Sequence, residues 1–145
     1  MNIEMGHCSQ IAMGIALAKP DKRVYCLDGD GAVIMHMGAI AIIGSRKVKN
    51  LKHIVFNNGC HDSVGGQPTC GFSVSITGIA KACGYTLALQ AQTGREVDEK
   101  MGIIKSADGP VMLEIRVKKG ARSDLGRPKS SPEQNKTRFM EFLAE

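Results

Sequence analysis

Residues 24–32, Val-Tyr-Cys-Leu-Asp-Gly-Asp-Gly-Ala, decide the fold of this chain. The first five of them form a short, mostly apolar run that predicts a strand, and Gly29-Asp30-Gly31 predicts a tight turn directly after it. Helical character resumes over residues 32–43. A second predicted strand, residues 53–57, is followed by the turn Asn57-Asn58-Gly59. Two strands therefore each end in an unusual polar turn.

The rest of the chain continues the alternation of helices and strands. The pattern predicts helices over residues 10–18, 76–83 and 95–106, strands over 85–89 and 111–117, and a long glycine-rich loop over 58–72. The first of these helices is apolar on all sides and is closed by Pro20, so we expect it to be buried. Such alternation predicts an α/β fold with a mostly parallel sheet and helices on both faces. Both polar turns then lie at the carboxyl ends of strands, where ligands bind in such sheets.

The length and the charge divide the chain into two parts. It has 145 residues, which is one ordinary domain, and a net charge of +5. Residues 1–115 hold eleven basic and ten acidic side chains, whereas residues 116–145 hold eight and four. We predict an α/β domain over 1–117 and a basic C-terminal arm over 118–145. The arm ends in a helix that begins at Ser131-Pro132 and packs on the domain or on a partner chain.

Composition excludes several classes of protein. Aromatic residues make up only 4% of the chain and there is no Trp, so a base-stacking surface for nucleic acid is not expected. The longest apolar run, residues 39–43, is far shorter than the roughly 20 residues that span a bilayer, and no leader is recognised. The five cysteines are an odd number and form no C-x-x-C pair, which favours a reducing compartment. We expect a cytoplasmic protein with neither a membrane nor a nucleic-acid partner.

The two polar turns together offer a metal site. Asp30 and Asn58 supply two hard oxygen ligands, and the turn after Asn58 can bring in the main-chain carbonyl of Cys60 as a third, which suits Mg²⁺ or Ca²⁺. Gly29 and Gly31 let the backbone approach a phosphate closely, and the N–H groups of the following helix favour anions. Either motif alone is more often an ordinary turn. A dinucleotide site is a weaker alternative because the third glycine is missing, and a P-loop is excluded because no Gly-Lys-Ser/Thr is present.

The pair of motifs resembles the cofactor signature of thiamine diphosphate enzymes. Twenty-five residues separate Gly29-Asp30-Gly31 from Asn57-Asn58, which is within the range of that family. Residues 5–7, 59–69 and 124–128 are similar to the members that decarboxylate 3-phosphonopyruvate, and the similarity runs from Met5 to Leu143. The resemblance implies the thiamine diphosphate-binding fold, specifically its pyrophosphate-binding domain, with thiamine diphosphate and Mg²⁺ as cofactors.

The resemblance also implies roles for individual residues. Asp30, Asn58 and the carbonyl of Cys60 would bind Mg²⁺, and Met5 would be the apolar wedge that bends the cofactor into a V shape. The cofactor-binding residues that it implies are Ile3, Glu4, Met5, Gly29, Asp30, Gly31, Ala32, Asn58, Cys60, Asp62 and Ser63. Glu4 departs from the serine of the family. His61, Ser63 and Gln67 are candidate substrate contacts, or they only order the loop. His53, at the start of a strand, is interpreted as structural.

The activity that the resemblance implies is that of a carboxy-lyase. It is a 2-oxo acid decarboxylase that converts 3-phosphonopyruvate to phosphonoacetaldehyde and CO₂, a reaction of phosphonate metabolism. The beta subunit of the decarboxylases of sulfopyruvate is the alternative, and a non-catalytic Mg²⁺- or nucleotide-binding module is an alternative of another class. The family pairs this domain with a pyrimidine-binding domain that 145 residues do not provide. We therefore expect a homo- or hetero-oligomer with that domain or an alpha subunit, and no turnover by the isolated chain.

Overall fold

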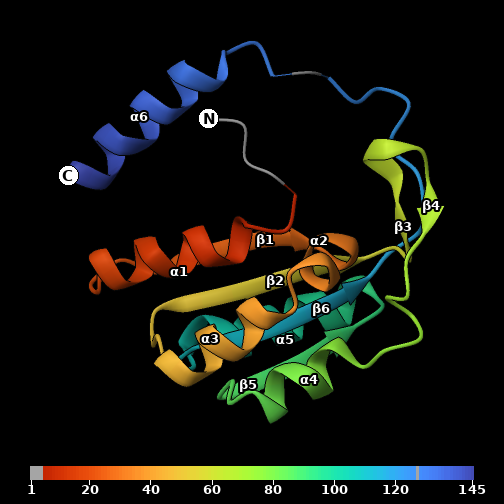
Figure 1. The fold of residues 1–145 in the computed structure, drawn as a ribbon, viewed down its shortest axis with the longest axis horizontal. Helices are drawn as coiled ribbons and strands as arrows, with labels where there is room; N and C mark the ends of the chain where they lie inside the picture. Colours follow the sequence, from red (N-terminus) through yellow and green to blue (C-terminus); the bar gives the residue numbers. More distant parts are fainter. Residues whose placement is uncertain (1–4, 127) are drawn as a thin grey trace.

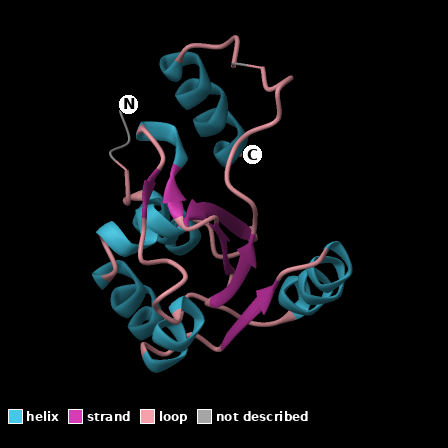
Figure 2. Cartoon of the chain, turned by 90° about the vertical axis from the view of Figure 1, so that its right-hand side faces the viewer, coloured by secondary structure: helices cyan, strands magenta, loops and turns pink. Residues whose placement is uncertain are grey.

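The computed structural model describes residues 5–126 and 128–145 as a four-stranded sheet with helices on its two faces (Figures 1 and 2). The helices are α1 (Cys8–Ala18), α2 (Asp30–Met35), α3 (Gly38–Arg46), α4 (Ile76–Ala82), α5 (Gly94–Ser106) and α6 (Pro132–Ala144). The strands are β1 (Val24–Gly29), β2 (Leu51–Asn57), β3 (Cys60–His61), β4 (Gln67–Pro68), β5 (Leu87–Ala91) and β6 (Val111–Arg116), and a 3-10 turn, η1, spans Asp62–Val64.

The main sheet has the order β1-β2-β6-β5, and all of its strand pairs are parallel. The register pairs Gly29 of β1 with Phe56 of β2, so the two strands end side by side. The first residue of α2, Asp30, and the turn at Asn58 therefore leave the sheet at the same edge. The predicted α/β fold with a mostly parallel sheet is confirmed.

The two faces of the sheet are covered unequally. One core cluster joins α1, α3 and α4 to the sheet through residues such as Ala16, Ile43 and Ala80. A second, smaller cluster lies on the other face under α5, around Ile104 and Leu113. Because α5 packs on β5 and β6, it leaves apolar side chains of the other two strands exposed, and Leu27 of β1 is 62% exposed.

Three predicted helices and strands need correction. The helix expected over residues 32–43 is two helices, because the backbone leaves the helical conformation at His36 and returns to it at Met37, the residue before α3. The strand expected over 85–89 is β5, which begins two residues later than predicted, at Leu87. The N–H of Tyr85 still donates to the Ala80 carbonyl at the end of α4. β2 begins at Leu51, two residues before the predicted start.

The long loop over residues 58–72 contains a small hairpin. β3 and β4 pair antiparallel, with Cys60 opposite Pro68. Gly65 and Gly66 between them have φ values of 116° and 74°, which residues with a Cβ rarely adopt, and they let the chain reverse. In Figure 1 this hairpin stands beyond the carboxyl end of the sheet.

The first helix is only partly buried, which contradicts the expectation of complete burial. α1 buries Ser9, Ala12 and Ala16, whereas Leu17 is 54% exposed. The small residues face the sheet because they allow close packing, and the larger apolar side chains are left on the outside.

The C-terminal arm runs from β6 past the hairpin and returns to α1, where α6 lies (Figure 1). The ammonium nitrogen of Lys22 lies over the ring of Phe142 in α6, and it is 5.3 Å from the ring centroid. Apart from this helix end, α6 is almost entirely exposed. Within the described residues, no helix is long and apolar enough to cross a membrane.

Candidate functional site

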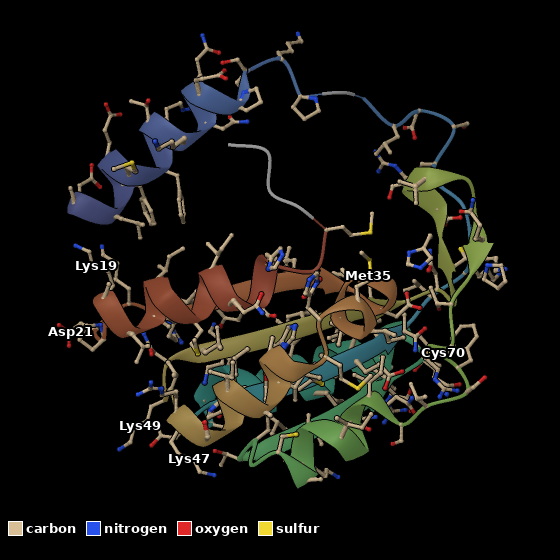
Figure 3. All side chains as sticks on the ribbon, in the orientation of Figure 1. Lys19, Asp21, Met35, Lys47, Lys49 and Cys70 are labelled. Carbon is tan, nitrogen blue, oxygen red and sulfur yellow. The ribbon has the colours of Figure 1, made fainter. Side chains whose placement is uncertain are left out.

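A hollow of about 350 Å³ lies at the carboxyl end of β1 and β2, beside the hairpin. It is the place where the sheet edge, the start of α2 and the long loop meet. The residues that line it are Met5, Gly29, Asp30, Gly31, Ala32, Phe56, Asn58, Cys60, His61, Asp62 and Ser63. In Figure 3, Met35 and Cys70 lie at the end of the molecule that holds this hollow, and Lys47 and Lys49 lie at the opposite end.

Asp30 is the first residue of α2 and is only 1% exposed. The hydroxyl of Thr69 donates a hydrogen bond to its Oδ2 atom. The backbone of Gly71 also lies against this carboxylate, because a Cβ built on Gly71 would be 2.3 Å from the same oxygen. The carboxylate is thus held by a loop that follows it by about forty residues.

The two asparagines of the second turn have different surroundings. Asn57 is buried, and its Nδ2 atom donates to the Gly71 carbonyl (2.7 Å) and to Glu114 Oε1 (2.8 Å). Asn58 lines the hollow, where its Oδ1 atom accepts from the N–H of Cys60 at 3.0 Å. Asn57 anchors the loop, and Asn58 is the asparagine whose oxygen is at the hollow.

Cys60 offers its carbonyl more readily than its thiol. The thiol donates a hydrogen bond to Asp62 Oδ1 at 3.0 Å, and this bond, together with burial, raises the pKa of the Cys60 thiol. The residue opposite Cys60 in the hairpin is Pro68, which has no N–H to donate to the Cys60 carbonyl. The thiol therefore stays protonated, and the hairpin leaves the carbonyl oxygen to other partners.

Asp62 connects the hairpin to the basic arm. Its carboxylate accepts from the Cys60 thiol, from the backbone N–H of Gly120 (2.8 Å) and from Asn58 Nδ2 (2.8 Å). These hydrogen bonds, and the nearby charge of Lys119, lower the pKa of Asp62. The beginning of the arm therefore lies beside the hollow, and Lys119 brings positive charge to it.

The structure gathers most of the predicted site residues and separates some. His61 and Ser63 line the hollow, but Gln67 does not; its amide lies against Gly65. The His61 ring packs on Gly31 so closely that a Cβ there would be 2.3 Å from it. Ile3 and Glu4 lie outside the described residues, as does Arg127 of the arm.

The donor set of this hollow fits a hard cation with a diphosphate. A carboxylate oxygen, an amide oxygen and a main-chain carbonyl are the ligands that Mg²⁺ takes, with phosphate and water oxygens in the remaining positions. Gly29, where no atom lies within 4 Å of a built Cβ, and the backbone N–H groups at the start of α2 leave room and donors for an anion beside the metal. Asp30, Asn58 and Cys60 could hold the metal, and Gly29, Gly31 and Ala32 the diphosphate.

Two residues of the site were not predicted from the sequence. Thr69 and Gly71 hold the Asp30 carboxylate, but they lie in a loop with several similar polar and glycine residues. Only their position after the hairpin distinguishes them, and that position requires the fold.

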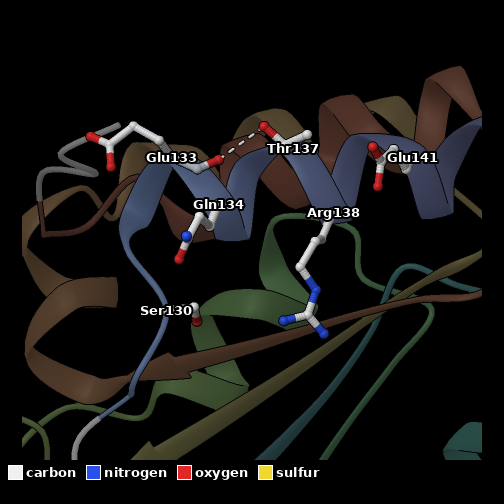
Figure 4. A pocket seen from close by; sticks show the side chains of 6 residues that line it. All are labelled: Ser130, Glu133, Gln134, Thr137, Arg138 and Glu141. Atoms are coloured by element: carbon white, nitrogen blue, oxygen red, sulfur yellow. Dashed lines mark hydrogen bonds between the residues drawn. The ribbon is translucent and has the colours of Figure 1, made fainter.

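A second hollow, along α6, is unrelated to this site. It is lined by Ser130, Glu133, Gln134, Thr137, Arg138 and Glu141, and the Thr137 hydroxyl donates to the Glu133 carbonyl (Figure 4). All its lining residues come from one helix and the residue preceding its cap, so it is a groove along an exposed helix.

The fold and the site define an α/β domain that gathers oxygen donors and the start of a helix at the carboxyl ends of its strands. The family of C-terminal TPP-binding domains of thiamine pyrophosphate enzymes matches residues 1–115. The chain belongs to this family, whose cofactor is the thiamine diphosphate named above.

Known proteins resemble the chain in sequence and in structure. It is 34% identical to phosphonopyruvate decarboxylase of Streptomyces viridochromogenes over 139 residues, which are 96% of this chain and 35% of that protein. It is 29% identical to the beta subunit of sulfopyruvate decarboxylase of Methanothermobacter thermautotrophicus, over 80% of this chain and 60% of that subunit. A thiamin diphosphate-dependent enzyme of Mycobacterium smegmatis has the same fold, with a TM-score of 0.66 and 24% identity over 80% of this chain and 22% of that one. The chain thus spans about a third of the first of these relatives.

Proposed function

We propose that this chain is the diphosphate-binding part of a thiamine diphosphate-dependent 2-oxo acid decarboxylase that acts on 3-phosphonopyruvate. The products are phosphonoacetaldehyde and CO₂. The observation that carries the proposal is the single hollow that gathers Asp30, Asn58 and Cys60 with Gly29 and Gly31. The similarity to phosphonopyruvate decarboxylase over 96% of the chain supports the choice of substrate.

The residues of this chain bind and orient the cofactor. Asp30, Asn58 and the Cys60 carbonyl hold Mg²⁺, and the backbone N–H groups of Gly31 and Ala32 bind the diphosphate. Met5 lines the hollow shortly before the start of α1, and it would support the bent shape of the cofactor. Thiamine diphosphate supplies the electron sink that a 2-oxo acid needs in order to lose CO₂.

The loop and the arm recognise the anionic substrate. His61 and Ser63 line the hollow and are placed to donate hydrogen bonds to the carboxylate or the phosphonate. Lys119 adds positive charge where the arm passes Asp62, which favours a substrate with two anionic groups. Gln67 stays a candidate substrate contact: it is the hairpin partner of His61, so both side chains lie on the same face, and its amide lies against Gly65 beside the hollow.

The chain requires a pyrimidine-binding domain, which it obtains from a partner chain or from a longer form of the same protein. The relatives' greater length supports this requirement, because the chain corresponds to 35% of the Streptomyces protein. The sulfopyruvate relative is a beta subunit, which shows that a related enzyme is divided between chains. Alone, the chain is expected to bind thiamine diphosphate very weakly and to show no turnover.

The test is reconstitution with the cognate pyrimidine-binding partner. CO₂ and aldehyde are measured with 3-phosphonopyruvate and with sulfopyruvate, in the presence of Mg²⁺ and thiamine diphosphate. Faster release of CO₂ from 3-phosphonopyruvate supports the proposal. Faster release of CO₂ from sulfopyruvate would instead identify the chain as part of a sulfopyruvate decarboxylase. Full activity of the purified chain with no added protein contradicts the need for a partner.

Asp30→Ala, measured in the enzyme reconstituted with the pyrimidine-binding partner, tests the metal site, with Asp98→Ala on the exposed side of α5 as the control. Loss of Mg²⁺-dependent cofactor binding in the first variant only is expected, since Asp30 supplies the one charged ligand. Equal cofactor binding by both variants would show that Asp30 is not a ligand. Cofactor binding without decarboxylation in the reconstituted wild type would favour a non-catalytic binding module.

Sulfopyruvate is the second candidate substrate. The match to a separate beta subunit favours it, because the chain covers 60% of that subunit but only 35% of the Streptomyces decarboxylase. The similarity of residues 124–128 to the enzymes of phosphonopyruvate favours the first candidate.

A further inference from the structure

A second cluster of ligand-type side chains lies inside the fold, on the face of the sheet that α1 covers. Cys26 and Asp28 are two residues apart on β1 and so point to the same face, and His53 is the register partner of Cys26 on β2. All three are buried, and His53 is 0% exposed. Their sulfur, oxygen and nitrogen atoms lie within 4.8 Å of one another. The proposed chemistry of the hollow uses none of these three side chains.

Cys8 brings a fourth donor to this cluster from another element. It is the first residue of α1, and its Sγ atom lies 3.4 Å from the Sγ atom of Cys26. It also lies 3.5 Å from the carbonyl of Leu27, between the two β1 ligand-type residues. The cluster therefore contains two thiols, one carboxylate and one imidazole, contributed by three elements.

Two distances within the cluster are close to those between the ligands of one tetrahedral zinc ion. Zn–S bonds of about 2.3 Å and Zn–N and Zn–O bonds of about 2.0 Å place two sulfurs about 3.8 Å apart, and a nitrogen and an oxygen about 3.3 Å apart. The two sulfurs are 3.4 Å apart, and His53 Nε2 is 3.3 Å from Asp28 Oδ2. Cys26, Asp28 and His53 have their ligand atoms within 4.8 Å of one another, and Cys8 is not part of that group, so the start of α1 would move toward Asp28 and His53 to complete the tetrahedron.

The imidazole and the carboxylate are each held at the atom that faces away from the cluster. His53 Nδ1 lies 3.2 Å from the Tyr85 hydroxyl, and Asp28 Oδ1 accepts from the N–H of Gly29 at 2.9 Å. When Nδ1–H donates to Tyr85, the lone pair of Nε2 points to the cluster. Such outer hydrogen bonds orient the histidine and carboxylate ligands of metal sites.

We propose that Cys8, Cys26, Asp28 and His53 form a structural zinc site, separate from the magnesium site at Asp30. Sulfur and nitrogen donors select Zn²⁺, whereas the oxygen donors of the hollow select Mg²⁺. Both thiols lose their protons to solvent when the ion binds, so two protons are released for each zinc bound. The ion would join the start of α1 to β1 and β2, and it would hold the chain that follows Met5 in place.

The test is zinc binding by the purified chain under reducing conditions. One zinc per chain is expected, with an X-ray absorption spectrum of about two sulfurs at 2.3 Å and two nitrogen or oxygen atoms at 2.0 Å. This measurement on the wild-type chain needs no variant that could fail to fold. A substoichiometric zinc content, or a shell of oxygen atoms alone, would overturn the proposal.

Matched variants locate the ion. Cys8→Ser, at the half-buried end of the cluster, should weaken zinc binding at least about 100-fold, and Tyr85→Phe about 10-fold. Cys70→Ser removes an exposed thiol elsewhere and should leave the affinity unchanged, as should Asp30→Ala. Equal effects of Cys8→Ser and Cys70→Ser, or loss of zinc in Asp30→Ala alone, would assign the ion to another place. A Cys8–Cys26 disulfide that persists with reductant would also contradict the site.

Discussion

The side-chain amide of Asn57 donates a hydrogen bond of 2.8 Å to the carboxylate of Glu114, and it joins the last residue of β2 to β6 beneath the hollow. Glu114 is only 1% exposed, and Arg116 lies 3.6 Å from the same carboxylate oxygen. The same amide also donates to the Gly71 carbonyl. One buried asparagine thus connects the sheet, a buried carboxylate and the loop that holds Asp30.

Replacing Asn57 by Ala should lower the free energy of unfolding by about 3 kcal/mol, because it leaves a buried carboxylate and a buried carbonyl without this donor. Asn58→Ala, at the next position, should cost less than half as much, since Asn58 is only half buried. Urea unfolding of the wild type and of both variants measures these free energies of unfolding. Equal losses would mean that the buried hydrogen bonds of Asn57 contribute little.

Gly71→Ala should displace the Asp30 carboxylate. The new Cβ would lie 2.3 Å from Asp30 Oδ2 and 2.7 Å from Asn57 Oδ1, so one of these side chains must move. We expect Mg²⁺-dependent binding of thiamine diphosphate by the reconstituted enzyme to weaken at least about 10-fold, the effect of losing a supporting contact of a metal ligand. Gly102→Ala, where no atom lies within 4 Å of the new Cβ, should bind as the wild type does. Isothermal titration provides the affinities.

Stability should depend on pH through Glu96 at the start of α5. Hydrogen bonds from the N–H groups of Gln92 and Thr93 lower the pKa of Glu96 below its ordinary value of 4.5. The unfolded chain therefore binds a proton more readily, so this stabilisation is complete above the ordinary pKa and is lost as the pH falls through the lowered one.

Glu96→Gln should consequently be less stable than the wild type at pH 7, and the difference should shrink as the pH falls below about 4. Glu99→Gln, which removes an exposed partner of Arg95 on the same helix, is the control. Urea midpoints measured between pH 3 and 7 test this. A constant difference between Glu96→Gln and the wild type would contradict the assignment.

Asp62→Ala should free the beginning of the C-terminal arm. The carboxylate of Asp62 accepts from the N–H of Gly120, and the variant removes this tie between the hairpin and the arm. Trypsin should then cleave after Lys119 severalfold faster than in the wild type, because cleavage requires local release of the backbone. Asp108→Ala, another exposed aspartate, should be cleaved at the wild-type rate.

The alternation of strands and helices and the two motifs at strand ends could be predicted because they depend on local patterns. Gly29-Asp30-Gly31 and Asn57-Asn58 each begin at the last residue of a strand. Parallel pairing then brings the two turns to one edge of the sheet. The break at His36 was not predicted, because the apolar pattern continues across it; there the His36 ring packs against His7, 4.1 Å between centroids.

By itself, the sequence determined the α/β class, the parallel sheet and which turns bear the polar groups of the site, because strand and helix periodicities and glycine turns act over short stretches of chain. Only the tertiary structure decided which distant residues meet: Thr69 and Gly71 around Asp30, Gly120 at Asp62, and Cys8 against Cys26. The register of the strands and the packing of the loop and of α1 set these contacts. Neither has a signal in the local order of residues.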